Sequence, residues 1–390
     1  MIYLFVLIFL LLCAALLDRK VDKRFQKLGY TLAYIILIVL LTLRFRVGGD
    51  SLFYEDVFDT MPDLKGLSKL DLLVLDYQPL WYLLTAIVRS TIDDFRFFQF
   101  IHALIINTAI FYLIPKYTER KFLAVLVYYI FFYLYFGTEI LREALAVIVF
   151  LFAYPLIFKK KYISYYLLCC VAYLFHAFAM FTFVVPALVY VFRTPIKLYH
   201  ILVIAIITVL APSITSNIIL NLFEFSPYIS RQIRFYTDLE ININGILKNL
   251  FDVMPVLLVM LLQRKYNRVD PILIPAVNIY FITILLSVSI AGALRLSNYF
   301  VFFFYMAFIN TFLSHRQFRI PRFRMQLVLV VTLLIISKSF YYMRDMSRYN
   351  YGYPAHFYNR YLPYNSVFDP EINRTRENIF RKSMDENINR

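Results

Sequence analysis

Long runs of apolar residues, separated by short polar segments, recur along almost the whole chain. Most runs have roughly 15–20 residues, about the length that a helix needs to cross the hydrocarbon core of a bilayer. Lipid offers no hydrogen-bond partner to an open strand edge, so such runs form helices. The pattern predicts an all-α, polytopic membrane protein with about 12 transmembrane helices. They are expected at 2–17, 29–43 and 95–114, twice within 122–158, twice within 162–192, and at 199–210, 247–262, 272–290, 299–313 and 326–341.

Two of these runs are too long for one span, and a further run is too short. Residues 122–158 contain a turn signal at Gly137, which predicts a hairpin with its apex there. Residues 162–192 are expected to form two short spans, with His176 near the outer turn. Residues 79–88 are expected to form a re-entrant or surface helix instead of a span.

Basic residues give the chain a formal net charge of +15. They gather in short segments between apolar runs, and the positive-inside rule places such segments in the cytoplasm. We therefore attribute the charge to membrane topology and not to nucleic acid. Counting spans from these segments places both termini outside, together with loops at 44–94 and 213–245 and a polar tail at 343–390. Residues 1–342 are expected to form a single transmembrane helical bundle.

Two arginines lie inside otherwise apolar runs. Arg142 follows Glu139 and precedes Glu143, and Arg295 is the only charged side chain of its run. An arginine at bilayer depth costs at least a few kcal/mol, so such a residue usually faces a protein cavity and marks a site. The planar guanidinium fits phosphate, and two of them suggest a diphosphate. The alternative for Arg142 is an internal salt bridge with the neighbouring glutamates.

A further polar stretch falls on the same predicted outer side. The sequence RFRVGGDSLFYEDVF (44–58) leaves a span through Arg44 and Arg46, turns at two glycines and then presents Asp50 and Tyr54. Glycines let the backbone approach a ligand closely. The alternative is an interfacial anchor followed by an ordinary turn.

The chain lacks the motifs of several enzyme classes. It has no nucleotide-binding loop, zinc-protease motif, paired metal-binding aspartates or serine-hydrolase elbow. No cofactor and no metal are therefore called for, and an enzyme acting outside would need an already activated, lipid-linked substrate. His176 is a candidate base or a hydrogen-bond donor to sugar, with a buried core histidine as the alternative.

Several segments together resemble one family of bacterial membrane proteins. These are RVGGDSLFY (46–54), YQPLWYLL (77–84), EILREALAVIVFLFAYPLIFKKK (139–161), AYLFHAFA (172–179) and LRLSNYF (294–300). In order and setting they are similar to the EpsG family of Wzy-like polysaccharide polymerases, over roughly residues 30–310. Two positions depart from that pattern. Gln78 stands where the family often has an acid, which makes it a poor base, and Glu143 stands where the family often has an amide.

The resemblance implies a broadly GT-C-like glycosyltransferase of the bacterial inner membrane. It would polymerise undecaprenyl-diphosphate-linked repeat units of a capsule, exopolysaccharide or O-antigen at the periplasmic or outer face, with a flippase and a chain-length regulator as partners. We expect Arg142 and Arg295 to stabilise the leaving diphosphate, with Asp50 or, as second choice, His176 as the base. The expected substrate contacts are Arg44, Arg46, Tyr54, Glu143 and Tyr299.

Two other function classes remain open on sequence grounds. A transporter or flippase of a lipid-linked glycan would also use intramembrane arginines and broken helices. Such a transporter needs charged lining from both sides, whereas the ionisable intramembrane groups of this chain are expected on one face. An O-antigen ligase or an acyltransferase would share the apolar bundle and the outer site, and the ligase differs only in its acceptor.

Overall fold

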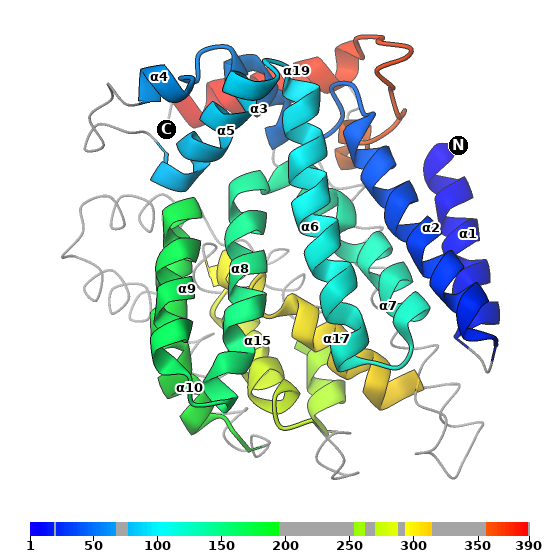
Figure 1. Cartoon of the computed structure of the whole chain (residues 1–390), viewed down its shortest axis with the longest axis vertical. Coiled ribbons are helices and arrows are strands. Elements are labelled where there is room, and N and C mark those ends of the chain that lie inside the picture. Colours follow the sequence, from blue (N-terminus) through cyan, green and yellow to red (C-terminus); the bar gives the residue numbers. More distant parts are fainter. Residues whose placement is uncertain are drawn as a thin grey trace. The chain divides into compact units, whose positions relative to one another are not determined.

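The computed structural model describes residues 1–18, 21–67, 77–194, 253–261, 270–287, 293–313 and 356–388 (Figure 1). Within these ranges the regular structure is helical, and the extended backbone forms only isolated bridges, from Arg44 to Ser366 and from Ser366 to Asp369. Four described helices are long and apolar enough to cross a membrane: Lys23–Thr42, Phe95–Tyr117, Lys121–Glu139 and Leu141–Phe158. The predicted all-α class is confirmed, and these four helices have the length and composition of membrane spans. The predicted spans at 199–210 and 326–341, the loop at 213–245 and part of 247–262 lie outside the described residues.

The described chain divides into two compact units, and the first contains most of the N-terminal half. In it, α1 (Ile2–Leu17) packs on α2 (Lys23–Thr42) and on α7 (Lys121–Tyr128), and α2 packs on α6 (Phe95–Tyr117). The carboxylate of Asp18, at the end of α1, accepts hydrogen bonds from the backbone N–H groups of Phe122 (3.1 Å) and Leu123 (2.8 Å). These N–H groups have no partner within α7 itself, so Asp18 caps α7 and joins it to α1.

The predicted hairpin within 122–158 is confirmed. Helix α7 continues through two π-helical turns, η2 (Tyr129–Tyr133) and η3 (Tyr135–Glu139), and α8 (Leu141–Phe158) starts two residues after Glu139. The backbone at Ile140 has φ −125° and ψ 45°, which lies outside the helical region and separates the two spans. The π-turns therefore bring Glu139 and Arg142 to one break between two membrane-length helices.

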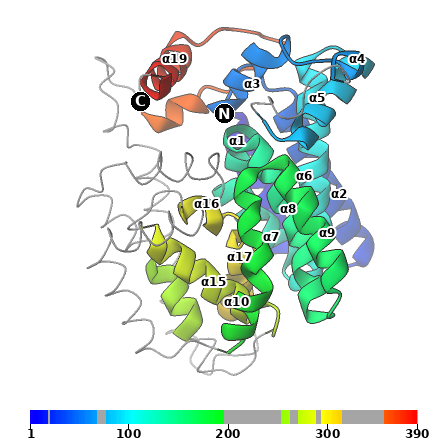
Figure 2. The ribbon, with the colours of Figure 1, turned by 90° about the vertical axis from the view of Figure 1, so that its left-hand side faces the viewer.

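Three short helices lie at one end of the first unit, together with the C-terminal helix (Figures 1 and 2). They are α3 (Asp50–Phe58), α4 (Leu64–Leu67) and α5 (Pro79–Thr91). Helix α5 starts with proline at its first position and packs on α4 and α6. Its 13 residues rise only about 20 Å, less than the bilayer core. This agrees with the expectation of a helix at 79–88 that does not span.

The second unit contains the region from Phe150 to Cys170 and the described residues from Ala177 to Leu313. Its helices are the end of α8, most of α9 (Tyr162–Phe175), η4 (Ala177–Val184), α10 (Val185–Val191), α15 (Leu273–Leu286), α16 (Ala293–Ser297) and α17 (Val301–Leu313). Helix α15 packs on α10, α16 and α17. Aromatic rings fill this core, with the rings of Tyr154 and Phe303 centred 4.5 Å apart. The break expected near His176 lies at that residue, between α9 and η4.

The C-terminal region is folded where the structure describes it. It forms η5 (Phe357–Arg360) and α19 (Arg374–Ile388), and these belong to the first unit. Its backbone pairs with the segment that follows α2: Phe45 N–H donates to Asn365 O at 2.9 Å and Val367 N–H donates to Leu43 O at 2.9 Å. The expected polar tail at 343–390 therefore contains a segment that packs onto the first unit.

Candidate functional site

Neutral groups hold the guanidinium of Arg142 at the start of α8. Its Nε donates to the Tyr54 hydroxyl at 2.7 Å and its Nη1 donates to Gln78 Oε1 at 3.2 Å. The guanidinium carbon also lies 4.5 Å from the centre of the Tyr77 ring, a cation–π contact. The neighbouring Glu139 does not neutralise Arg142, because its carboxylate pairs with Arg360. The positive charge of Arg142 is oriented by these contacts and is not compensated by them.

Tyr54 connects α3 with α8 and α5. Its side chain is buried, and its ring lies 4.8 Å from that of Trp81. Burial raises the pKa of Tyr54 to about 12, although the positive charge of Arg142 opposes that shift. The hydroxyl therefore stays protonated at neutral pH. Since it accepts from Arg142, its own hydrogen is directed elsewhere and suits a substrate oxygen.

The turn before α3 is packed directly against the break between η3 and α8. Gly48 has φ +114°, a conformation that L side chains rarely adopt, and a Cβ at this position would lie 2.5 Å from Thr138. Gly49 donates its N–H to Glu139 Oε1 at 2.6 Å. Both glycines of the predicted ligand-binding turn are thus in close contact with protein, and this contact requires them.

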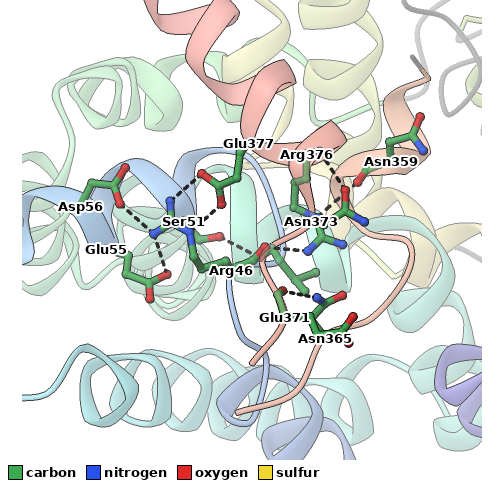
Figure 3. A network of polar contacts seen from close by, with 11 residues as sticks. Arg46, Ser51, Glu55, Asp56, Asn359, Asn365, Glu371, Asn373, Arg376 and Glu377 are labelled. Carbon is green, nitrogen blue, oxygen red and sulfur yellow. Dashed lines mark hydrogen bonds and ion pairs between the residues drawn. The ribbon is translucent and has the colours of Figure 1, made fainter. Parts of the chain in front are cut away.

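Arg46 forms ion pairs with carboxylates of the first unit (Figure 3). Its Nε and Nη2 bind the two carboxylate oxygens of Glu377 at 2.6 and 2.9 Å, and its Nη1 lies 2.7 Å from Asp56 Oδ1. These partners raise the pKa of Arg46 above its ordinary value, chiefly through the hydrogen bond to Glu377. A phosphate contact by Arg46, as expected from the sequence, would require breaking these ion pairs.

A second arginine, Arg376 on α19, also joins this helix to the segment after α2 (Figure 3). Arg376 is buried, and it donates to the backbone oxygens of Arg46 (2.8 Å), Asn359 (3.3 Å) and Pro363. Three carbonyl oxygens, one from the segment after α2 and two from the C-terminal segment around η5, thus converge on one guanidinium. Arg376 and Glu377 together fasten α19 to the segment that carries Arg46.

Arg44 is buried with its charge largely unsatisfied. Only 2% of its surface is exposed, and Nη1 donates to the carbonyl oxygen of Leu41. Nε and Nη2 have no hydrogen-bond partner among the described residues. Burial lowers the pKa of Arg44. Packing alone does not account for a buried cation of this kind, since buried polar groups are nearly always hydrogen-bonded.

The remaining predicted residues are spread over both units. Asp50 is exposed in the first turn of α3, close enough to Tyr54 to favour its protonated form. Glu143 is 1% exposed and lies within α8. His176 directly follows α9, and its backbone N–H donates to Ala172 O at 3.0 Å. In the second unit, Arg295 is half-buried in α16 and Tyr299 is buried against Phe150, with ring centres 5.6 Å apart.

The structure adds several residues to the vicinity of Arg142 that sequence reasoning did not select. Tyr77, Gln78 and Trp81 come from the YQPLW segment, whose resemblance to the family was the available signal. His102 Nε2 lies 3.0 Å from Leu141 O and so ties α6 to the first turn of α8. Arg360 carries no local signal, because its partner Glu139 is 221 positions away in sequence.

A model of the EpsG family matches residues 27–366. This match covers most of the chain. The chain belongs to the EpsG family. No curated protein and no solved structure matches it. Membership of the EpsG family, together with the four membrane-length helices, supports a multi-pass membrane protein with a polysaccharide-polymerase type of function. The matched range includes Tyr54, Arg142 and Arg360, whereas Arg376 and Glu377 lie beyond it.

Proposed function

We propose that this protein polymerises oligosaccharide repeat units that are linked to a polyprenyl diphosphate, with undecaprenyl diphosphate as the carrier. The growing chain is transferred from its diphosphate lipid onto a new lipid-linked unit at the outer face of the bacterial inner membrane. The EpsG-family match supports the polymerase class. One structural observation supports the diphosphate: among the described residues, neutral groups orient the guanidinium of Arg142, and an anion could therefore pair with its charge.

The reaction requires charge stabilisation at the leaving group. A hydroxyl of the acceptor sugar attacks the anomeric carbon of the chain, the bond from that carbon to the diphosphate oxygen breaks, and its electron pair stays on the oxygen. The hydroxyl proton passes to a base. A preorganised cation stabilises the negative charge most strongly when the charge forms. We assign this role to Arg142, with Arg295 as a second cation.

The other assignments follow from position. Asp50 stands exposed at the start of α3, four residues before Tyr54, and we assign it the role of base, with His176 as the alternative. The Tyr54 hydroxyl, fixed by Arg142, donates its hydrogen to a phosphate or sugar oxygen. Tyr77 provides an aromatic face beside the same guanidinium. Glu143 and Tyr299 are buried, so a contact with substrate would require an opening of the surrounding helices.

The decisive experiment uses purified protein in detergent with lipid-linked repeat units as donor and acceptor. Chain growth, seen as a ladder on a gel, supports polymerisation, because no sealed bilayer is present for transport. Absence of growth in detergent together with movement of labelled repeats across sealed vesicles would instead identify a transporter. Transfer to a lipid A-type acceptor without ladder formation would identify a ligase.

A further inference from the structure

A buried carboxylate joins three separate segments beside the proposed site. Glu139 is 6% exposed, and its Oε1 accepts the Gly49 N–H at 2.6 Å. Its Oε2 lies 3.0 Å from Nη1 of Arg360, which comes from the C-terminal segment. Arg360 also accepts the Gly48 N–H through its own backbone oxygen at 2.9 Å. Glu139 and Arg360 together therefore bind both backbone N–H groups of the glycine turn.

The contacts are tight enough to exclude larger residues at the turn. A Cβ on Gly49 would lie 2.4 Å from Glu139 Oε2 and 2.8 Å from Arg360 Nη1. A side chain on residue 49 would therefore displace the ends of Glu139 and Arg360. The turn, the carboxylate and the guanidinium consequently form one close-packed unit, which we call the Glu139–Arg360 clamp.

The clamp lies between the two elements that carry the Arg142 contact. Gly49 directly precedes α3, on which Tyr54 lies, and Glu139 is three residues before Arg142. The hydrogen bond from Arg142 Nε to the Tyr54 hydroxyl, at 2.7 Å, spans these same two elements. A shift of the turn relative to Glu139 would displace Tyr54 from Arg142.

The carboxylate of Glu139 is not available for proton transfer to substrate. Both of its oxygens already accept hydrogen bonds, one from a backbone N–H and one from a cation. A buried carboxylate costs free energy unless it is paired and hydrogen-bonded, and Glu139 meets both conditions. Its chemistry therefore suits a fixed structural link.

We propose that Glu139 is a positioning residue for the Tyr54–Arg142 pair, and that Arg360 of the C-terminal segment holds it in place. This inference rests on the proposed polymerase function for its effect on turnover. Its geometric part is independent of any reaction.

The test compares Glu139→Gln, Glu139→Leu, Arg360→Gln and the double variant Glu139→Gln/Arg360→Gln. Glutamine keeps an acceptor for the Gly49 N–H but loses the ion pair, whereas leucine loses both. We expect kcat/KM for chain extension to fall about tenfold in either glutamine variant and roughly 100-fold in Glu139→Leu, chiefly through kcat. The double variant is expected to be no worse than the single ones, because both remove the same interaction.

A spectroscopic readout separates positioning from activity. Trp81 is the sole tryptophan of the chain, and its ring lies 4.8 Å from that of Tyr54. Displacement of α3 changes the environment of this indole, so Glu139→Leu should alter tryptophan emission and near-UV circular dichroism. Arg96→Gln is the matched control, because it removes an exposed ion pair with Asp94 and should alter neither.

The outcomes distinguish failure of the polymerase function from failure of the Glu139–Arg360 clamp. If wild-type protein extends no chains but Trp81 emission shifts in Glu139→Leu, the polymerase function fails and the clamp is upheld. If Glu139→Leu keeps the wild-type emission and full kcat/KM, the clamp is refuted. Should Glu139→Leu be absent from the membrane, the glutamine variants decide: additive losses in the double variant, or unchanged kcat/KM in both single ones, would overturn the proposal.

Discussion

Replacing Arg142 with lysine separates the geometry of a guanidinium from its charge. Arg142 uses two nitrogens to bind Tyr54 and Gln78, at 2.7 and 3.2 Å, and its guanidinium carbon lies over the Tyr77 ring. Lysine carries the same charge on one ammonium group at the end of a flexible stem. It can replace the charge, but it cannot hold both neutral partners and also present a pair of donors to a phosphate.

The expected loss follows from the contacts that lysine cannot restore. One hydrogen bond from a charged donor to a protein partner and one to a phosphate oxygen are lost, each worth about 1.5 kcal/mol at the lower end of its range. The sum of about 3 kcal/mol corresponds to roughly a 150-fold decrease in kcat/KM for Arg142→Lys. We expect kcat to carry most of it, because the diphosphate charge develops in the transition state.

The assay is chain extension of lipid-linked repeats by purified variants at equal concentration, with membrane abundance measured in parallel. Arg96→Lys serves as control, since Arg96 is exposed on α6. An Arg142→Lys protein that builds normal ladders would refute the bidentate phosphate role. If Arg142→Lys is lost from the membrane while Arg96→Lys is present at the wild-type level, Arg142 is required for folding.

Four other changes give direct tests. Tyr54→Phe removes the acceptor of Arg142 Nε at 2.7 Å and should lower kcat/KM about tenfold without changing abundance, while wild-type kinetics would exclude Tyr54. Asp50→Asn keeps the shape of the side chain but not its basicity, so turnover should vanish at saturating substrate while donor binding persists; normal turnover would move the base to His176. Arg44→Met removes a buried charge whose Nε and Nη2 have no hydrogen-bond partner among the described residues, so it should raise Tm by about 2–4 °C while lowering chain extension. A lower Tm would show that the guanidinium of Arg44 stabilises the fold. In a cysteine-free background, a cysteine at exposed Thr60 should react with an impermeant thiol reagent from outside and one at exposed Lys160 should not; the reverse pattern would overturn the orientation.

Local patterns predicted the helices well and the contacts between segments poorly. The break in 122–158 could be predicted because this apolar run is too long for one span and contains a single glycine, and the structure places the break at Ile140. The packing of the C-terminal segment onto the residues after α2 could not be predicted. Its contacts join Arg46 to Glu377 and Glu139 to Arg360, residues 331 and 221 positions apart, and no local periodicity encodes such pairs.

The candidate site was also predictable only where its residues stand out in the local sequence pattern. Arg142 and Tyr54 could be selected because a charge in an apolar run and a turn beside a span are visible in sequence, and the structure joins them by a hydrogen bond. Trp81 and Tyr77 are two of many aromatic residues, and apart from the family resemblance of their segment only the fold distinguishes them. Ser51 shows the reverse limitation, since it follows a predicted outer turn and yet is 2% exposed.

Arg46 and Arg142 show how partners, and not residue type, determine what an arginine can do. Both were candidates for phosphate contacts. Arg46 is surrounded by carboxylates, including one on α19 beyond the family-matched residues, so its charge is used to attach the C-terminal segment. Arg142 is bound by a hydroxyl, an amide oxygen and an aromatic ring, none of which carries a negative charge. An anionic substrate would compete with ion pairs at Arg46 but not with the described contacts of Arg142, which come from neutral groups, and this is why the diphosphate is assigned there.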